Sequence, residues 1–392
     1  MDLSEFPPAE PSIGGAGVAP SALPPLRIVF LGLSITSSWG NGHATTYRSL
    51  VRGLVRRGHS VLFLEHDKPW YRANRDLERP PYGETRLYGS VAELADLWRG
   101  AIRNADLVVL GSYVPEGVAV ARLVQRTAHG ATAFYDIDTP VTLAALAAGR
   151  CEYLAPELIR GFDLYLSFTG GPTLRELETR WGARAALPLY CSADQEDCRR
   201  VAETAPVWDL GYLGTYSDDR QPMLDRLLCA PARGWPEGRF VVAGSLYPEH
   251  LVWPANCERI DHLPPDRHPP FYAAQRFTLN VTRAEMVRRG FSPSVRLFEA
   301  ALCGTPVISD CWPGIETLFR PGVEILLARS EADVLGYLCD LPEPRRRAVA
   351  AAARARVLAS HTGAHRAAEL ERYARHVLDA RAATGEAAAC GW

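Results

Sequence analysis

The chain has 392 residues, of which 47% are hydrophobic and 22% charged, and its formal net charge is −2 at pH 7. This length suffices for two ordinary domains, each with its own core. The near-balance of charge lacks the basic field that non-specific nucleic-acid binding needs, so no nucleic-acid partner is expected. No apolar run of about 18 residues occurs, so no membrane span is expected.

The first residues are acidic where a secretory leader would be basic, and the nine cysteines are scattered without CxxC spacing. Both features favour a cytoplasmic protein with reduced thiols. Residues 1–25 are rich in Pro, Gly and Ala without a period, which predicts a disordered tail.

An N-terminal domain is predicted over residues 26–200, because short apolar runs alternate there with helical patterns. Near-continuous apolar runs of this kind are typical of parallel strands buried on both faces. The predicted strands are 27–32, 60–64, 106–110, 132–135, 164–167 and 185–189, and the predicted helices begin near Ala44 and at residue 116.

A second set of alternating elements predicts a C-terminal domain over 206–363, followed by a C-terminal helix and tail over 364–392. Residues 191–208 lack a period and are the candidate linker. Predicted strands are 210–214, 239–243, 258–260, 277–281, 305–309 and 324–327; predicted helices are 221–229, 270–276, 293–303, 331–340 and 344–359. The fold class is therefore α/β with two doubly wound, Rossmann-like domains, and ligands are expected in the cleft at the carboxyl ends of the strands.

The segment from Gly290 to Ser309 carries the most chemical information. Ser292 is a suitable N-cap, Pro293 a suitable first helical residue and Gly304 a suitable residue after the helix end. The amino end of such a helix presents unpaired N–H groups that suit a diphosphate. Arg296 in the first turn opposes the helix dipole unless an anion binds there.

Glu299 lies within an otherwise apolar stretch of this helix. A carboxylate at this place can accept hydrogen bonds from both vicinal hydroxyls of a ribose. The alternative is that Glu299 lies on an exposed helix face and pairs with Arg296 three residues earlier. Spacing alone leaves both open.

These motifs resemble the donor-binding block of GT-B glycosyltransferases, in particular the group 1 domain of CgeB-like spore-maturation proteins. The likeness extends over about 205–365 and is looser over 26–200. It rests on six segments: Gly211–Tyr216, Leu279–Val281, Ser294–Ala300, Cys303–Asp310, Gly322–Glu324 and Ser330–Asp333. The resemblance implies that the domain over 206–363 binds the nucleotide sugar.

The resemblance implies a role for each matching residue. Glu299 would hold the ribose, and the backbone at Ser294 and Val295 would face the diphosphate. Arg220, after the turn at Gly214 and Thr215, would contact the diphosphate, and Arg283 would reach phosphate. The loop Asp261-His262-Leu263 would meet the base. Many retaining relatives carry a second Glu eight positions before the ribose Glu, where this chain has Phe291, so retention of configuration does not follow.

The acceptor side is predicted in the N-terminal domain. Gly42 lets backbone approach a ligand after the first strand, and His43 follows it. Asp136 and Asp138 form a DxD sequence after a strand. The two aspartates could bind a metal, act as a general base or acceptor contact, or cap a helix. His43 is either a site residue or a solvent-exposed histidine at a helix terminus. We expect one of His43, Asp136 and Asp138 to be the base, and no metal ligand among them.

The predicted function is transfer of a sugar from a UDP-, dTDP- or GDP-linked donor to an unidentified small-molecule or glycan acceptor, with no further cofactor. The alternatives are a non-catalytic sugar-nucleotide-binding protein and a GT-B epimerase of nucleotide sugars. Neither the acceptor nor the oligomeric state follows from the sequence.

Overall fold

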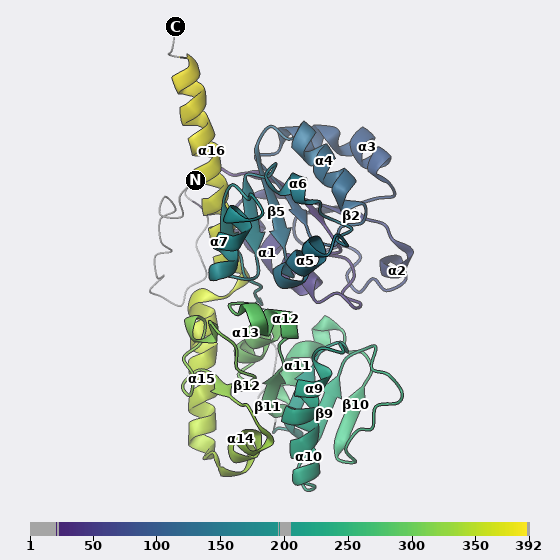
Figure 1. The fold of residues 1–392 in the computed structure, drawn as a ribbon, viewed down its shortest axis with the longest axis vertical. Coiled ribbons are helices and arrows are strands. Elements are labelled where there is room, and N and C mark those ends of the chain that lie inside the picture. The colour runs from purple at the N-terminus through teal and green to yellow at the C-terminus, as the bar shows by residue number, and fades with distance from the viewer. Residues whose placement is uncertain (1–20, 22, 195, 197–204, 390–392) are drawn as a thin grey trace. The chain divides into compact units, whose positions relative to one another are not determined.

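The computed structural model describes residues 21, 23–194, 196 and 205–389 (Figure 1). Most of the tail predicted over 1–25, and residues 195 and 197–204 of the predicted linker, lie outside the described residues. The chain divides into two compact units, one formed by residues 1–191 with 363–392 and the other by 192–362. No helix of the described residues is both long enough and apolar enough to cross a bilayer.

The first unit is built on a seven-stranded parallel sheet in the order β3-β2-β1-β4-β5-β6-β7. Its strands are β1 (Arg27–Gly32), β2 (Ser60–His66), β3 (Glu84–Tyr88), β4 (Leu107–Gly111), β5 (Ala131–Asp136), β6 (Leu164–Ser167) and β7 (Ala186–Pro188). Its helices are α1 (His43–Arg56), α2 (Pro69–Arg72), α3 (Val91–Asn104), α4 (Gly117–Thr127), α5 (Thr139–Ala147), α6 (Pro156–Ile159), α7 (Pro172–Thr179) and α16 (Gly363–Ala389). Buried aliphatic and aromatic residues of the strands and helices form its core.

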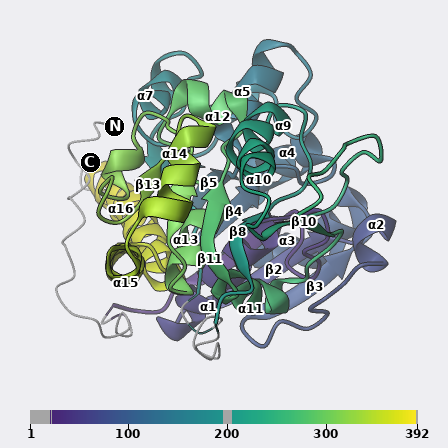
Figure 2. The ribbon, with the colours of Figure 1, turned by 90° about the horizontal axis from the view of Figure 1, so that it is seen from below.

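The second unit has a six-stranded parallel sheet in the order β10-β9-β8-β11-β12-β13. Its strands are β8 (Trp208–Leu213), β9 (Phe240–Ala243), β10 (Cys257–Ile260), β11 (Gln275–Asn280), β12 (Val307–Ser309) and β13 (Leu326–Leu327). Its helices are α9 (Gln221–Leu224), continued through a π-helical turn (Asp225–Cys229) into α10 (Ala230–Gly234), α11 (His268–Ala273), α12 (Ala284–Arg289), α13 (Val295–Leu302), α14 (Glu331–Leu335) with a second π-helical turn (Gly336–Asp340), and α15 (Glu343–Ser360). Figure 2 shows α13 near β11 and α15, both of which it contacts.

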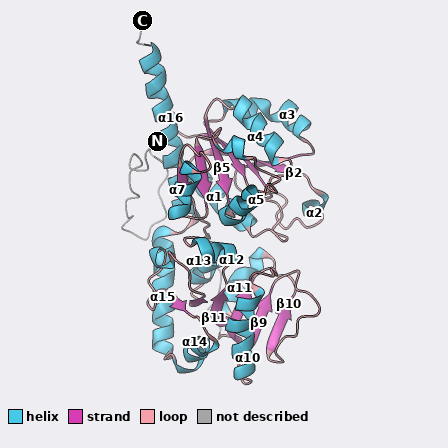
Figure 3. Ribbon diagram, viewed as in Figure 1, coloured by secondary structure: helices cyan, strands magenta, loops and turns pink. Residues whose placement is uncertain are grey.

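Both sheets have the doubly wound arrangement, with helices over their faces (Figure 3). In the first sheet the strand order reverses between β1 and β4, and in the second between β8 and β11. Loops leaving such neighbouring strands diverge and leave room for a ligand at the carboxyl edge. The loops after these four strands are therefore where each unit is expected to bind.

The last helix, α16, returns to the first unit and packs against α1. Two glycines allow the close approach, since a Cβ at Gly53 would lie 2.6 Å from the Gly363 carbonyl oxygen. Glu371 of α16 is buried and bonds Arg57 at 2.6 Å and Arg375 at 2.8 Å. Burial opposes its charge, but the Ser21 hydroxyl and these guanidinium groups bring the pKa of Glu371 down to about 2.

Most predicted elements are present within a few residues of their predicted bounds. One correction concerns the start of the donor helix, which begins at Val295 with Ser294 as N-cap, and not at Pro293 with Ser292. Gly290 and Phe291 have φ angles of 67° and 51°, and the Phe291 N–H donates to the Pro313 carbonyl. This left-handed turn holds the chain out of the helix for two more residues.

Candidate active site

The loop after β8 is shaped by two glycines. A Cβ on Gly214 would lie 2.7 Å from an Arg296 nitrogen, and a Cβ on Gly244 would lie 2.0 Å from the Gly214 carbonyl oxygen. Only glycine allows both approaches without displacing a neighbour. Arg220 folds back to donate to the Thr215 carbonyl at 2.6 Å, while its Nε is buried without a hydrogen-bond partner among the described residues.

Arg296 is the second cation at this loop and is 6% exposed. Its Nε donates to the Leu213 carbonyl at 2.5 Å, its Nη1 donates to Asn280 Oδ1 at 2.9 Å, and its guanidinium lies over the Tyr212 ring. Within the described part of the chain, no carboxylate lies at ion-pairing distance from either Arg296 or Arg220. A buried guanidinium of this kind favours an anion, because the hydrogen bonds described for it go to neutral groups.

The amino end of α13 lies beside Arg296. The Ser294 hydroxyl does not cap the helix and donates instead to Asn280 Oδ1 at 2.8 Å. The first-turn N–H groups, that of Val295 included, are therefore left without a side-chain cap, and unpaired N–H groups attract anions. Asn280, at the end of β11, holds both Ser294 and Arg296 in place.

Glu299 is 8% exposed, so its placement on an exposed helix face is excluded. Tyr272 Oη donates to Glu299 Oε2 at 3.2 Å, and His268 Nδ1 lies 3.6 Å from the same oxygen. Burial alone would raise the pKa of Glu299, but His268 and Tyr272 hold it below its usual value. Burial also opposes the charge of His268, yet the carboxylate raises the pKa of this histidine.

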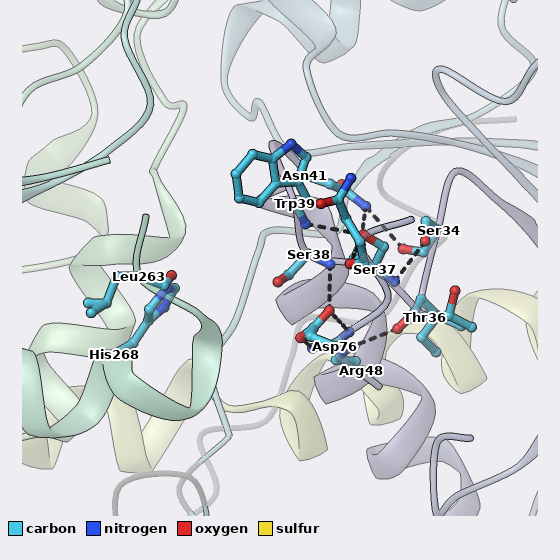
Figure 4. A network of polar contacts seen from close by, with 12 residues as sticks. Ser34, Thr36, Ser37, Ser38, Trp39, Asn41, Arg48, Asp76, Leu263 and His268 are labelled. Atoms are coloured by element: carbon cyan, nitrogen blue, oxygen red, sulfur yellow. Dashed lines mark hydrogen bonds and ion pairs between the residues drawn. The ribbon is translucent and has the colours of Figure 1, made fainter. Parts of the chain in front are cut away.

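The loop predicted to contact the nucleobase lies beside Glu299 and its partners. His268 Nε2 lies 3.2 Å from the Leu263 carbonyl oxygen, an interaction drawn in Figure 4. Asp261 and His262 are exposed, and Asp261 lies 3.9 Å from Arg259. His268 therefore contacts both the loop that is expected to bind the nucleobase and Glu299, the carboxylate that is expected to bind the ribose.

Arg283 is held by Asp219, whose Oδ2 lies 3.5 Å from Arg283 Nε and accepts the Ala284 N–H at 3.0 Å. Arg283 thus has a carboxylate at ion-pairing distance, which Arg220 and Arg296 lack among the described residues. Asp310, buried at the end of β12, accepts from both the N–H and the hydroxyl of Thr282 and fixes the loop that leads to Arg283.

In the first unit, the loop after β1 is tied down over residues 34–41 (Figure 4). Ser37 donates to the Asn74 carbonyl, and Asn41 Nδ2 donates to the Ser34 and Ser37 carbonyls. Arg48 of α1 forms two bonds to Asp76, at 2.8 and 3.0 Å. The loop that leads to Gly42 and His43 is therefore fixed by its own contacts.

Asp136 and Asp138 differ sharply in environment. Asp136 is fully buried, and accepts from Tyr165 Oη at 2.5 Å and from Thr142 Oγ1 at 2.7 Å. Burial raises the pKa of Asp136 to about 6. Asp138 is partly exposed, accepts from Tyr113 Oη at 3.1 Å and lies 3.7 Å from His43 Nε2.

The structure thus brings His43 and Asp138 together, whereas the side chain of Asp136 is buried in the core of the first unit. Tyr113 completes this group, since its ring stacks on His43 with centroids 5.7 Å apart. No group of three or more His, Cys, Asp or Glu side chains suited to a metal ion occurs within 21, 23–194, 196 and 205–389.

Several residues of these clusters were not identified from the sequence. His268 and Tyr272 are four residues apart on α11, the spacing of one helix face, and could have been found by that spacing. Asn280 and Asp310 lie within the segments that carry the resemblance, but no role was predicted for either, and Tyr113 gave no signal, because single polar residues at strand ends are common.

Residues 220–372 match a family model described as glycosyl transferase-like. Sucrose-phosphate synthase from Thermosynechococcus elongatus superposes with a TM-score of 0.66 at 15% identity, over 90% of this chain and 100% of that one. Anabaena HepE in complex with UDP-glucose superposes with a TM-score of 0.64 at 15% identity, over 91% of this chain and 100% of that one. The fold is GT-B.

A third GT-B structure, an alpha-glucosyltransferase in complex with UDP and a 13-mer DNA, gives a TM-score of 0.64 at 11% identity, over 90% and 100% of the two chains. No curated protein matches the sequence. The fold class predicted from the alternating pattern is confirmed by these GT-B neighbours.

Proposed function

We propose that the chain is a glycosyltransferase that moves a sugar from a UDP-, dTDP- or GDP-linked donor to a hydroxyl of a small-molecule or glycan acceptor. We assign it to the CgeB-like branch of the group 1 enzymes. The observation that carries the proposal is the combination of buried Arg296, which has no carboxylate partner among the described residues, with Glu299 one turn further along α13.

The donor binds to the second unit in this proposal. Arg296, Arg220 and the uncapped first turn of α13 receive the diphosphate, and Glu299 accepts hydrogen bonds from the ribose hydroxyls. The backbone of 261–263 faces the base. The neighbouring structures that hold UDP or UDP-glucose support this class of donor.

Catalysis follows from the same charges. When the bond from the sugar to the diphosphate breaks, its electron pair passes to a diphosphate oxygen, and Arg220, Arg296 and the helix dipole stabilise that charge. The protein therefore supplies the positive charge itself, and we propose that turnover needs no divalent metal.

The proton of the acceptor hydroxyl goes to His43 of the first unit. Asp138 is 3.7 Å from His43 Nε2 and stabilises the imidazolium that forms, while Tyr113 holds Asp138 from the other side. We assign Asp136, which is fully buried, to positioning this strand end through Tyr165 and Thr142.

A panel of UDP, dTDP, GDP and ADP in thermal-shift and calorimetric titrations tests the donor proposal, because a ligand that binds the native state raises the melting temperature. At least one of the first three should bind. Release of nucleoside diphosphate from the matching sugar donor then tests catalysis. Failure of all three nucleotides would refute the proposal; binding without turnover would point to a sugar-nucleotide-binding protein, and an isomerised nucleotide sugar to an epimerase.

A further inference from the structure

A second polar cluster lies at the carboxyl ends of β2 and β3 in the first unit. His66 is 4% exposed, and neither ring nitrogen has a hydrogen-bond partner among the described residues. Its ring lies 5.0 Å from that of Tyr88, whose hydroxyl is likewise buried and unpartnered there. Three unpaired polar atoms in one place are rare, since buried polar groups are nearly always hydrogen-bonded to protein or to a bound molecule.

The third member of the cluster is Glu116, which lies 3.6 Å from His66 Nε2 and whose side chain is 54% exposed. It comes from the loop after β4, where both Tyr113 and Glu116 have left-handed φ angles, 63° and 55°. Such angles are costly for residues other than glycine and are concentrated at functional sites. This loop carries Tyr113 against His43 at one end and Glu116 against His66 at the other.

The charges around His66 favour a neutral ligand. Burial, together with the nearby Lys68 ammonium, lowers the pKa of His66, so at neutral pH its ring offers one donor and one acceptor. Burial, together with Glu116 and Glu65, raises the pKa of Tyr88, so its hydroxyl stays protonated. An anion would be repelled by Glu116, Glu65 and Asp67. A cation that has no acceptor atoms would leave the Tyr88 hydroxyl and the imidazole N–H without a hydrogen-bond partner. Hydroxyl groups, which both donate and accept, match all the members of the cluster.

We propose that His66, Tyr88 and Glu116 form a subsite for a neutral, polyhydroxylated acceptor, which the loop of residues 112–116 joins to the His43–Asp138 pair. This proposal rests on the proposed glycosyltransferase function and adds the chemical class of the acceptor. Glu116, the exposed member, turns outward to admit the hydroxyls to the ring nitrogens of His66.

The test uses the full chain with its histidines labelled by nitrogen-15, observed by NMR during titration with glucose, myo-inositol and glycerol. At least one of these should shift the His66 ring resonances in a saturable way. Tyr88→Phe, which removes one buried hydroxyl, should weaken that binding roughly two- to tenfold. His66→Phe, which keeps a ring in place but removes the NMR reporter, should abolish binding of the same compound as measured by calorimetry.

Tyr337→Phe is the matched control, since it removes a tyrosine hydroxyl in the second unit that donates to the Leu327 carbonyl, and it should bind like the parent chain. UDP affinity, measured on the same samples, reports the donor site separately from this subsite. The proposal is overturned if none of the three compounds shifts His66, in which case a bound water satisfies the ring. It is also overturned if UDP-glucose shifts His66 and the free compounds do not, because the subsite would then hold the donor sugar.

Discussion

Replacement of Glu299 by Gln tests the ribose contact most directly. The side chain keeps its size and its place beside Tyr272 and His268, from which Glu299 Oε2 lies 3.2 and 3.6 Å away. What is lost is the negative charge that strengthens hydrogen bonds from the ribose hydroxyls. A hydrogen bond to a charged group contributes about 1.5–3 kcal/mol. Nucleoside diphosphate affinity should therefore fall by roughly 10- to 150-fold.

Isothermal calorimetry with UDP, or with whichever nucleotide binds best, measures this loss. Inorganic pyrophosphate is the matched control ligand, because it has the diphosphate charge but no ribose. Its affinity should be the same for Glu299→Gln and the parent chain, whereas Arg296→Gln should weaken both ligands. An unchanged nucleotide affinity in Glu299→Gln would refute the ribose contact, and an equal loss for pyrophosphate would show that the variant damages the anion site instead.

Three further outcomes are expected. The pKa of His268 in the folded protein is raised above 6.5, so its interaction with Glu299 stabilises the fold fully below pH 6.5 and is lost as the pH rises through that raised pKa. The parent chain should therefore melt at a higher temperature than His268→Gln at low pH. This difference in melting temperature should shrink, and not grow, as the pH rises. Asp138→Asn should lower kcat by about 10²–10⁴ with nucleotide affinity intact, while Asp136→Asn should retain most of its turnover; the reverse order in steady-state assays would assign the base to Asp136. Gly214→Ala should displace Arg296 and weaken pyrophosphate binding by about tenfold in calorimetry, and unchanged binding would separate this arginine from the anion site.

Independence from metal is tested on its own by turnover after dialysis against EDTA. We expect activity to persist, because Arg220, Arg296 and the amino end of α13 supply the positive charge. Complete loss that manganese restores would instead make the Asp136 and Asp138 pair a metal site.

The local sequence determined the alternation of strands and helices and, through it, the fold class. A continuous apolar run such as 107–110 marks a buried parallel strand whatever surrounds it. The sequence did not reveal β3, whose residues Glu84–Tyr88 are mostly exposed at the sheet edge and carry no apolar run. Nor did it place the start of α13, which a left-handed turn at Gly290 and Phe291 delays to Val295.

Glu299 shows the same division within the site. Its spacing in the helix left an exposed ion pair and a buried ligand contact equally open, because spacing specifies the face of a helix but not what covers that face. Burial beneath α11, with His268 and Tyr272 on the carboxylate, excludes the exposed alternative.

Asp136 and Asp138 stand two residues apart after one strand, yet only the tertiary structure distinguishes them. Tyr165, from the neighbouring strand β6, donates a hydrogen bond to buried Asp136, whereas His43 from the start of α1 and Tyr113 from the loop after β4 lie beside Asp138. The sequence determines which residues are available at the edge of each sheet. Contacts between segments distant in sequence decide which of them are buried, paired or free to react, because burial and charge pairing depend on neighbours that the local sequence does not contain.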